Sequence, residues 1–128
     1  MEVTYPPEAD AFRQEVRQFL DRNLPVDWPG FGALEHEEAE KFSRQWRRTL
    51  FENGLLGLSW PPEYGGGGRS KLEQIVLAEE LARARVPSGR VTDTTTVKMM
   101  GNTLVRWGTE EQKRRFLPRI LSGEDVWV

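Results

Sequence analysis

The sequence contains no cysteine and only one histidine, His36. Without cysteine the chain forms no disulfide, has no thiol nucleophile and offers no thiolate to a metal ion. His36 lies in the acidic run of residues 35–38, where we predict a solvated surface position. A metal site built from clustered histidine and cysteine is therefore excluded, and no metal is predicted.

Long apolar runs are also missing. No window approaches the roughly 20 apolar residues of a membrane-spanning helix, and residues 1–7 lack the basic and apolar stretches of a signal peptide. The 18 basic and 20 acidic residues leave a net charge of −2, which gives no reason to expect binding to nucleic acid or an anionic membrane. We predict a cytoplasmic protein with no nucleic-acid partner and no membrane insertion.

The sequence is rich in helical periodicity. Its 128 residues, 38% apolar and 30% charged, suit one domain with a modest core. Apolar residues recur at spacings of three and four in segments that begin near Pro7, Glu35, Ser70, Thr92 and Thr109. We predict an all-α bundle of about five or six helices. The residues expected inside it are Ala9, Phe12, Val16, Phe19, Leu20, Ala39, Phe42, Trp46, Leu50, Leu72, Ile75, Val76, Leu77, Ala78, Leu81, Ala82, Val97, Met100, Leu104, Trp107, Phe116, Leu117, Ile120 and Leu121.

Three local details complete this prediction. In the second helix Arg44, Arg47 and Arg48 are expected to face solvent, whereas the third helix is apolar around most of its circumference and is expected to be central. Residues 55–60 are apolar and short, and their periodicity does not distinguish a helical turn from a buried extended segment. Pro118 is expected to kink or split the last helix.

Adjacent acidic residues raise the question of acid–base chemistry. Glu79 with Glu80, and Glu110 with Glu111, could be interpreted as paired catalytic carboxylates. Neighbouring helical residues point in different directions, however, and such pairs are common on solvated faces. Glu110 and Glu111 also suit the first turn of a helix capped by Thr109. We therefore predict no catalytic residue in this chain.

The loop at residues 60–68, with two prolines and four consecutive glycines, leads into a helix with a capping box formed by Ser70 and Glu73. Glycines before a helix are compatible with a phosphate cradle. No lysine–serine/threonine pair follows, as it would in a P-loop, and no clear strand precedes the loop. A structural turn is the favoured interpretation, because glycine adopts a positive φ without strain.

Four segments, residues 12–20, 57–66, 79–83 and 108–124, resemble the N-terminal helical domain of acyl-CoA dehydrogenases in their order and spacing. The resemblance implies that residues 1–123 form this helical domain and that residues 124–128 start a middle β-domain missing from the chain. It also implies that the complete protein is an FAD-dependent enzyme that oxidises the Cα–Cβ bond of an acyl-CoA thioester. The catalytic glutamate and most flavin contacts would lie outside this chain, so these residues alone are expected to bind no FAD and to be inactive.

The same resemblance assigns residues to the acyl pocket. Aligned on residues 108–110, five positions fall where members of the family line the acyl chain: Val91, Thr92, Thr95, Thr96 and Met99. Hydroxyl groups there offer hydrogen bonds that a plain alkyl chain does not use. We therefore expect a polar, branched or bulky acyl group, for example a sterol-derived or aromatic one.

The resemblance also implies partners, namely an electron-transfer flavoprotein or similar acceptor and other subunits in a homo- or hetero-oligomer. Two alternatives stay open. Acyl-CoA oxidases, nitroalkane oxidases and related flavin monooxygenases share the scaffold. A stand-alone helical interaction module is an alternative from another class. Under the family interpretation, Trp107 and Trp127 suit contacts with absent domains.

Overall fold

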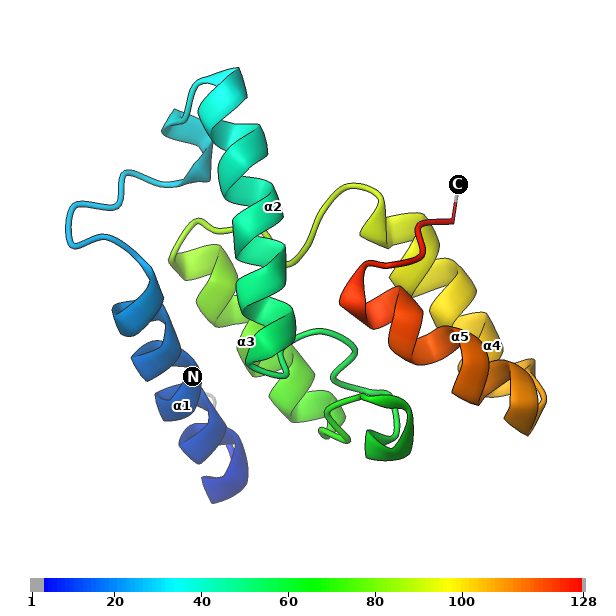
Figure 1. Cartoon of the computed structure of the whole chain (residues 1–128). Coiled ribbons are helices and arrows are strands. Elements are labelled where there is room, and N and C mark those ends of the chain that lie inside the picture. The colour runs from blue at the N-terminus through cyan, green and yellow to red at the C-terminus, as the bar shows by residue number, and fades with distance from the viewer. Residues whose placement is uncertain (1–3, 128) are drawn as a thin grey trace.

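The computed structural model describes residues 4–127, and all the regular elements among them are helical (Figure 1). The all-α prediction is confirmed. In chain order the elements are α1 (Pro7–Asn23), the 3₁₀ turn η1 (Phe31–Ala33), α2 (His36–Glu52), the 3₁₀ turn η2 (Pro62–Tyr64), α3 (Lys71–Arg83), the π-helix η3 (Thr94–Gly101), α4 (Asn102–Trp107) and α5 (Glu110–Ser122).

The core lies where α1, α2, α3 and α5 meet. Helix α1 lies beside α3 (Figure 1) and buries its predicted apolar face, while the ring of Trp46 on α2 lies 5.5 Å from that of Phe19. Leu117, Ile120 and Leu121 supply the inner face of α5. Residues 55–60 form turns with Leu55, Leu56, Leu58 and Trp60 buried, which settles the ambiguity left by their periodicity.

Both predicted capping boxes are present. The Ser70 hydroxyl accepts the Glu73 N–H at 3.2 Å, and the Thr109 hydroxyl accepts the Gln112 N–H at the same distance. These bonds satisfy backbone donors that have no partner within the first helical turn. Pro118 was expected to kink or split α5. The helix runs without a break past this exposed residue, so it is not split.

Helix α3 is not surrounded by protein on all sides. Leu72 and Ile75 are 39% and 43% exposed, and Ala78 and Ala82 are exposed as well. Its buried residues form one face, and one of them is the charged Glu80. The prediction that α3 is buried around most of its circumference is therefore wrong, because α1, η3 and the 55–60 turns do not enclose the helix.

A charged network joins α1 to α3. Arg13 donates to Glu80 at 2.8 Å and to Glu79 at 2.9 Å, and Arg17 lies 3.1 Å from Glu80. Tyr5 donates its hydroxyl to Glu79 at 2.6 Å. Glu80 is only 3% exposed, which corrects the expectation of a solvated face. A charged side chain is tolerated in a buried position when oppositely charged partners, here the two arginines of α1, contact it.

This network makes stability depend on pH. Burial works to raise the pKa of Glu80, but the hydrogen bonds and charges of Arg17 and Arg13 outweigh it and hold the pKa below its ordinary 4.5. A lowered folded-state pKa stabilises the fold above pH 4.5, and this contribution is lost as the pH falls through the folded value.

We predict that Glu80→Gln lowers the free energy of unfolding at pH 7 by about 1.5–3 kcal/mol, because a hydrogen-bonded charge is removed. The difference from wild type should shrink as the pH falls below 4.5. Denaturant titrations at pH 7, 4.5 and 3 measure it. Glu38→Gln, at an exposed carboxylate of α2, should change stability little. A loss of unfolding free energy in Glu80→Gln that is the same at all three pH values would contradict the prediction.

Candidate functional site

The five predicted pocket residues fall in the turn before η3 and in η3 itself. Val91 and Met99 are 92% and 61% exposed, Thr92 is exposed and Thr95 is half-buried. Thr96 differs, since only 2% of it is exposed. A ligand can therefore approach four of these positions from the outside of the chain, and Thr96 belongs to the interior.

The helix that carries these residues has π-helical hydrogen bonding over eight residues, Thr94–Gly101. A helix starting near Thr92 was expected, and the structure confirms it, with helical assignment from Asp93 onward. The π-helical hydrogen bonding was not foreseen. Consecutive β-branched residues at 94–96 are weak α-helix formers, but nothing in the sequence indicates a π-helix. Short π-helical insertions are rare and occur frequently at functional sites.

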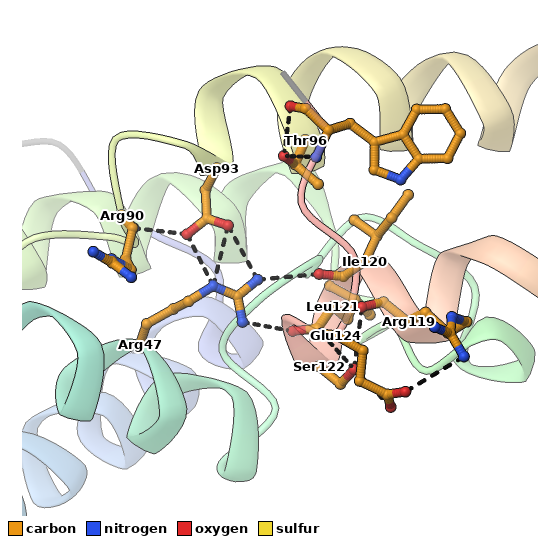
Figure 2. Close-up of polar contacts among 10 residues, drawn as sticks. Arg47, Arg90, Asp93, Thr96, Arg119, Ile120, Leu121, Ser122 and Glu124 are labelled. Atoms are coloured by element: carbon orange, nitrogen blue, oxygen red, sulfur yellow. Dashed lines mark hydrogen bonds and ion pairs between the residues drawn. The ribbon is translucent and has the colours of Figure 1, made fainter.

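One buried ion pair fixes the start of η3. Arg47 of α2 donates through Nε to both carboxylate oxygens of Asp93 at 3.1 Å, and its Nη2 lies 3.0 Å from Oδ1 (Figure 2). The two side chains are 10% and 11% exposed. The planar guanidinium suits this two-point contact with a carboxylate.

The same guanidinium also holds the end of α5. Its Nη1 donates to the Leu121 carbonyl at 2.7 Å and its Nη2 to the Ile120 carbonyl at 3.1 Å (Figure 2). These carbonyls lie in the last helical turn, where acceptors lack partners within the helix. Arg47 was expected to face solvent, so this prediction is wrong. Its place three residues before buried Leu50, beside the apolar stripe, is the only sequence signal for an inward position.

Asp93 also hydrogen-bonds to Arg90 and so holds the turn at residues 90–93, which carries two of the predicted pocket residues. Its carboxylate accepts the Arg90 N–H at 2.6 Å, and its own N–H donates to the Arg90 carbonyl at 3.0 Å. Val91 and Thr92 lie between these two ends of the turn. The position of their side chains therefore depends on Arg47 through Asp93.

Trp60, from the proline–glycine loop, fixes the other end of η3. The indole is 1% exposed and donates to the Asn102 side-chain oxygen at 2.8 Å. Gly101 has no side chain where the indole lies, and a Cβ atom there would overlap the ring. Gly66 likewise makes room for the Trp60 backbone.

The loop offers no phosphate cradle. The backbone N–H groups of all five residues 65–69 donate to carbonyls of Pro62, Pro61, Gly57, Trp60 and Leu58, respectively. A phosphate site of the P-loop kind needs such N–H groups free to point at the ligand. The favoured interpretation, a structural turn, is supported, and the loop does not fit the pyrophosphate of a dinucleotide.

A cavity of about 290 Å³ lies between the 55–60 turns, α3 and η3. Leucines 55, 56, 58, 77 and 81 line it together with Trp60 and Val97. Its polar lining residues are Ser59, Gln74, Ser88, Asp93, Lys98 and Asn102. None of the five predicted pocket residues lines this cavity. A larger hollow of about 640 Å³ lies elsewhere, against Leu24, Trp28 and the ends of α1 and α3.

Other kinds of site find no support in the described part of the chain. Residues 4–127 contain no group of three His, Cys, Asp or Glu side chains arranged to hold a metal ion. None of the helices in that range combines the length and the apolar character needed to cross a membrane.

Residues 6–124 match the family described as "Acyl-CoA dehydrogenase, N-terminal domain". The chain belongs to the acyl-CoA dehydrogenase family. The family resemblance read from residues 12–20, 57–66, 79–83 and 108–124 is thereby confirmed, and the helical region corresponds to that family's N-terminal domain.

Individual acyl-CoA dehydrogenases show how far this similarity extends. Acyl-CoA dehydrogenase IpdE1 of Mycolicibacterium smegmatis is 39% identical over 125 residues, which are 94% of this chain and 31% of that protein. A solved structure of the Tcur3481-Tcur3483 steroid ACAD is 37% identical, with a TM-score of 0.68 over 98% of this chain and 32% of that one. A chain in the crystal structure of the ChsE4-ChsE5 complex from Mycobacterium tuberculosis is 33% identical. The TM-score is 0.64, and the match covers 97% of this chain and 30% of that one. The chain thus spans about a third of the length of these relatives.

Proposed function

We propose that this chain is the pocket-forming N-terminal domain of an FAD-dependent acyl-CoA dehydrogenase that oxidises the Cα–Cβ bond of a bulky, sterol-derived acyl-CoA thioester. The accessible side of η3 and of the turn before it carries the proposal. Met99 offers an apolar contact, while Thr92 and Thr95 offer hydroxyl groups to a substrate that is not a plain alkyl chain. The 37% identity to a protein described as a steroid ACAD supports the same substrate class.

Within this proposal, the 128 residues bind and orient the acyl group and perform no chemistry. The family resemblance assigns the glutamate base and most flavin contacts to other parts of the complete subunit. In agreement with the second assignment, the loop most similar to a phosphate cradle uses its own N–H groups internally. Arg47 and Trp60 hold the backbone that carries Val91, Thr92, Thr95 and Met99. These four side chains would therefore present a fixed surface to the acyl group. Precise placement of a reacting group contributes strongly to rate.

The substrate class is tested on the complete subunit, expressed from the reading frame that contains this chain together with any co-purifying partner. Flavin reduction is followed anaerobically with a sterol-derived acyl-CoA and with octanoyl-CoA. We expect kcat/KM to favour the sterol-derived thioester by at least roughly tenfold, since each apolar contact contributes about 1–3 kcal/mol to discrimination. A preference for octanoyl-CoA would contradict the proposed substrate.

We also propose that the complete enzyme is a hetero-oligomer that passes electrons to an electron-transfer flavoprotein or a similar acceptor. The support is that one solved relative is a complex of two differently named proteins, ChsE4 and ChsE5. The mass of the purified assembly distinguishes a heteromer from a homo-oligomer. Oxygen consumption with stoichiometric hydrogen peroxide would instead indicate an oxidase.

A further inference from the structure

Thr96 makes a contact that a pocket-lining residue would not be expected to make. Its hydroxyl donates to the Trp127 carbonyl at 3.0 Å and accepts the Trp127 N–H at 2.9 Å. The hydroxyl has a single proton to donate, and this contact uses it. Figure 2 shows Thr96 at the point where the last described residues reach η3.

The segment that Thr96 contacts is held along α5 as well. Asp125 accepts two hydrogen bonds from the Arg119 guanidinium at 3.0 Å each, and its N–H donates to the Arg119 carbonyl at 3.2 Å. The Trp127 ring lies edge-on to Phe116 with 5.6 Å between centroids. Residues 124–127 are therefore folded back over α5 and reach η3 at Thr96, without forming a strand within the described residues.

We propose that Thr96 is a positioning residue that fastens η3 to residues 124–127 and does not contact the acyl group. The statement that Thr96 does not contact the acyl group rests on the proposed function. The statement that Thr96 holds η3 to residues 124–127 does not. Besides the Trp60 contact at Gly101, η3 has two buried anchors near its start, which are Asp93, held by Arg47, and Thr96, held by Trp127. Thr95 and Met99 lie on the same helix with side chains that remain accessible.

Because Thr96 is buried, its hydrogen bonds to Trp127 hold the two segments together strongly. A hydrogen bond shielded from water is stronger, and breaking it leaves unpaired groups in a poorly solvated place. The Trp127 peptide would lose both a donor and an acceptor partner if the Thr96 hydroxyl were removed. Any shift of residues 124–127 is then transmitted to the first turn of η3, between the anchored start and the Trp60 contact at Gly101.

The fastening is tested on the 128-residue chain by hydrogen exchange at the Trp127 amide. Thr96→Val keeps the shape of the side chain and removes its hydroxyl, so the Trp127 amide should exchange roughly tenfold faster, as expected for loss of a bond of ordinary strength. Thr96→Ser restores the hydroxyl and should restore protection. Thr95→Val is the matched control and should leave Trp127 unchanged. Wild-type protection in Thr96→Val would overturn the proposal.

A second measurement on the complete subunit separates positioning from substrate contact. Thr96→Val should lower kcat by a similar factor for every acyl-CoA tested and leave KM unchanged, because a displaced helix still binds substrate but orients it poorly. Thr96→Ser should recover kcat. A KM change in Thr96→Val that depends on the acyl group would show direct contact and overturn the proposal. If the wild-type subunit oxidises no acyl-CoA, the proposed function fails, and the Trp127 exchange result still decides the fastening.

Discussion

Replacing Arg47 with methionine is expected to lower the free energy of unfolding by about 3–5 kcal/mol, the usual cost of breaking a buried ion pair from one side. Methionine fills a similar volume without any donor. Among the described residues, Asp93, 8% exposed, would keep only the Arg90 N–H as a partner. The carbonyls of Ile120 and Leu121 would each lose a donor. Denaturant unfolding of the 128-residue chain, followed by circular dichroism, measures the change.

Two variants make the Arg47 result specific. Arg48→Met removes the same chemical group from the next, exposed residue of α2 and should stay within about 0.5 kcal/mol of wild type. Asp93→Asn combined with Arg47→Met removes the charge left behind, so the double variant should lose less than the sum of the single losses. Strictly additive losses would show that the two side chains are not coupled and would contradict this account of η3.

Replacing Trp60 with alanine is expected to cost a similar amount, about 3–5 kcal/mol, because a fully buried indole leaves a large cavity. The ring connects the proline–glycine loop to η3 through the Asn102 hydrogen bond and its close approach to Gly101. Trp107→Ala removes the same side chain from a site that is 75% exposed and should change stability by about 0.5 kcal/mol or less. Thermal or denaturant unfolding compares the two.

The contact between Trp60 and Gly101 can be tested from both sides. Gly101→Ala places a methyl group against the indole and should destabilise the chain by about 1–3 kcal/mol. In the Trp60→Ala background the same change meets no ring, and alanine should then be favoured over glycine within a helix by about 0.5–1 kcal/mol. Gly32→Ala, where a Cβ meets nothing within 4 Å, is the control. A Gly101→Ala penalty that persists without Trp60 would contradict the packing described.

These results bear on function because both side chains act on one helix from its two ends. Arg47 sets the turn that carries Val91 and Thr92, and Trp60 sets the end of η3 beyond Met99. Under the proposed function η3 is a wall of the acyl pocket, and a wall fixed at both ends would keep its shape when the substrate binds, which reduces the conformational cost of binding. The proline–glycine loop contributes to the site by placing Trp60, and we assign it no ligand.

Much of the fold could be predicted from local patterns. The inner faces of α1 and α5, the capping boxes at Ser70 and Thr109, and the glycine turn all appear in the structure. Each depends on residues within a few positions of one another, so the information lies in the sequence itself. The errors arose where the environment of a helix decides the outcome, as for the exposed face of α3 and the π-helical hydrogen bonding of η3.

By itself, the sequence determined the helices, their caps, the all-α class and the family, because spacing and turn chemistry act over short distances along the chain. Only the tertiary structure decided that Arg47 and Glu80 are buried and that Thr96 holds Trp127. Arg47 lies 46 positions from Asp93 and 73 from Ile120, and Thr96 lies 31 positions from Trp127. A polar side chain is stable in the interior only where distant segments bring it a partner, and no local pattern records which segments will meet.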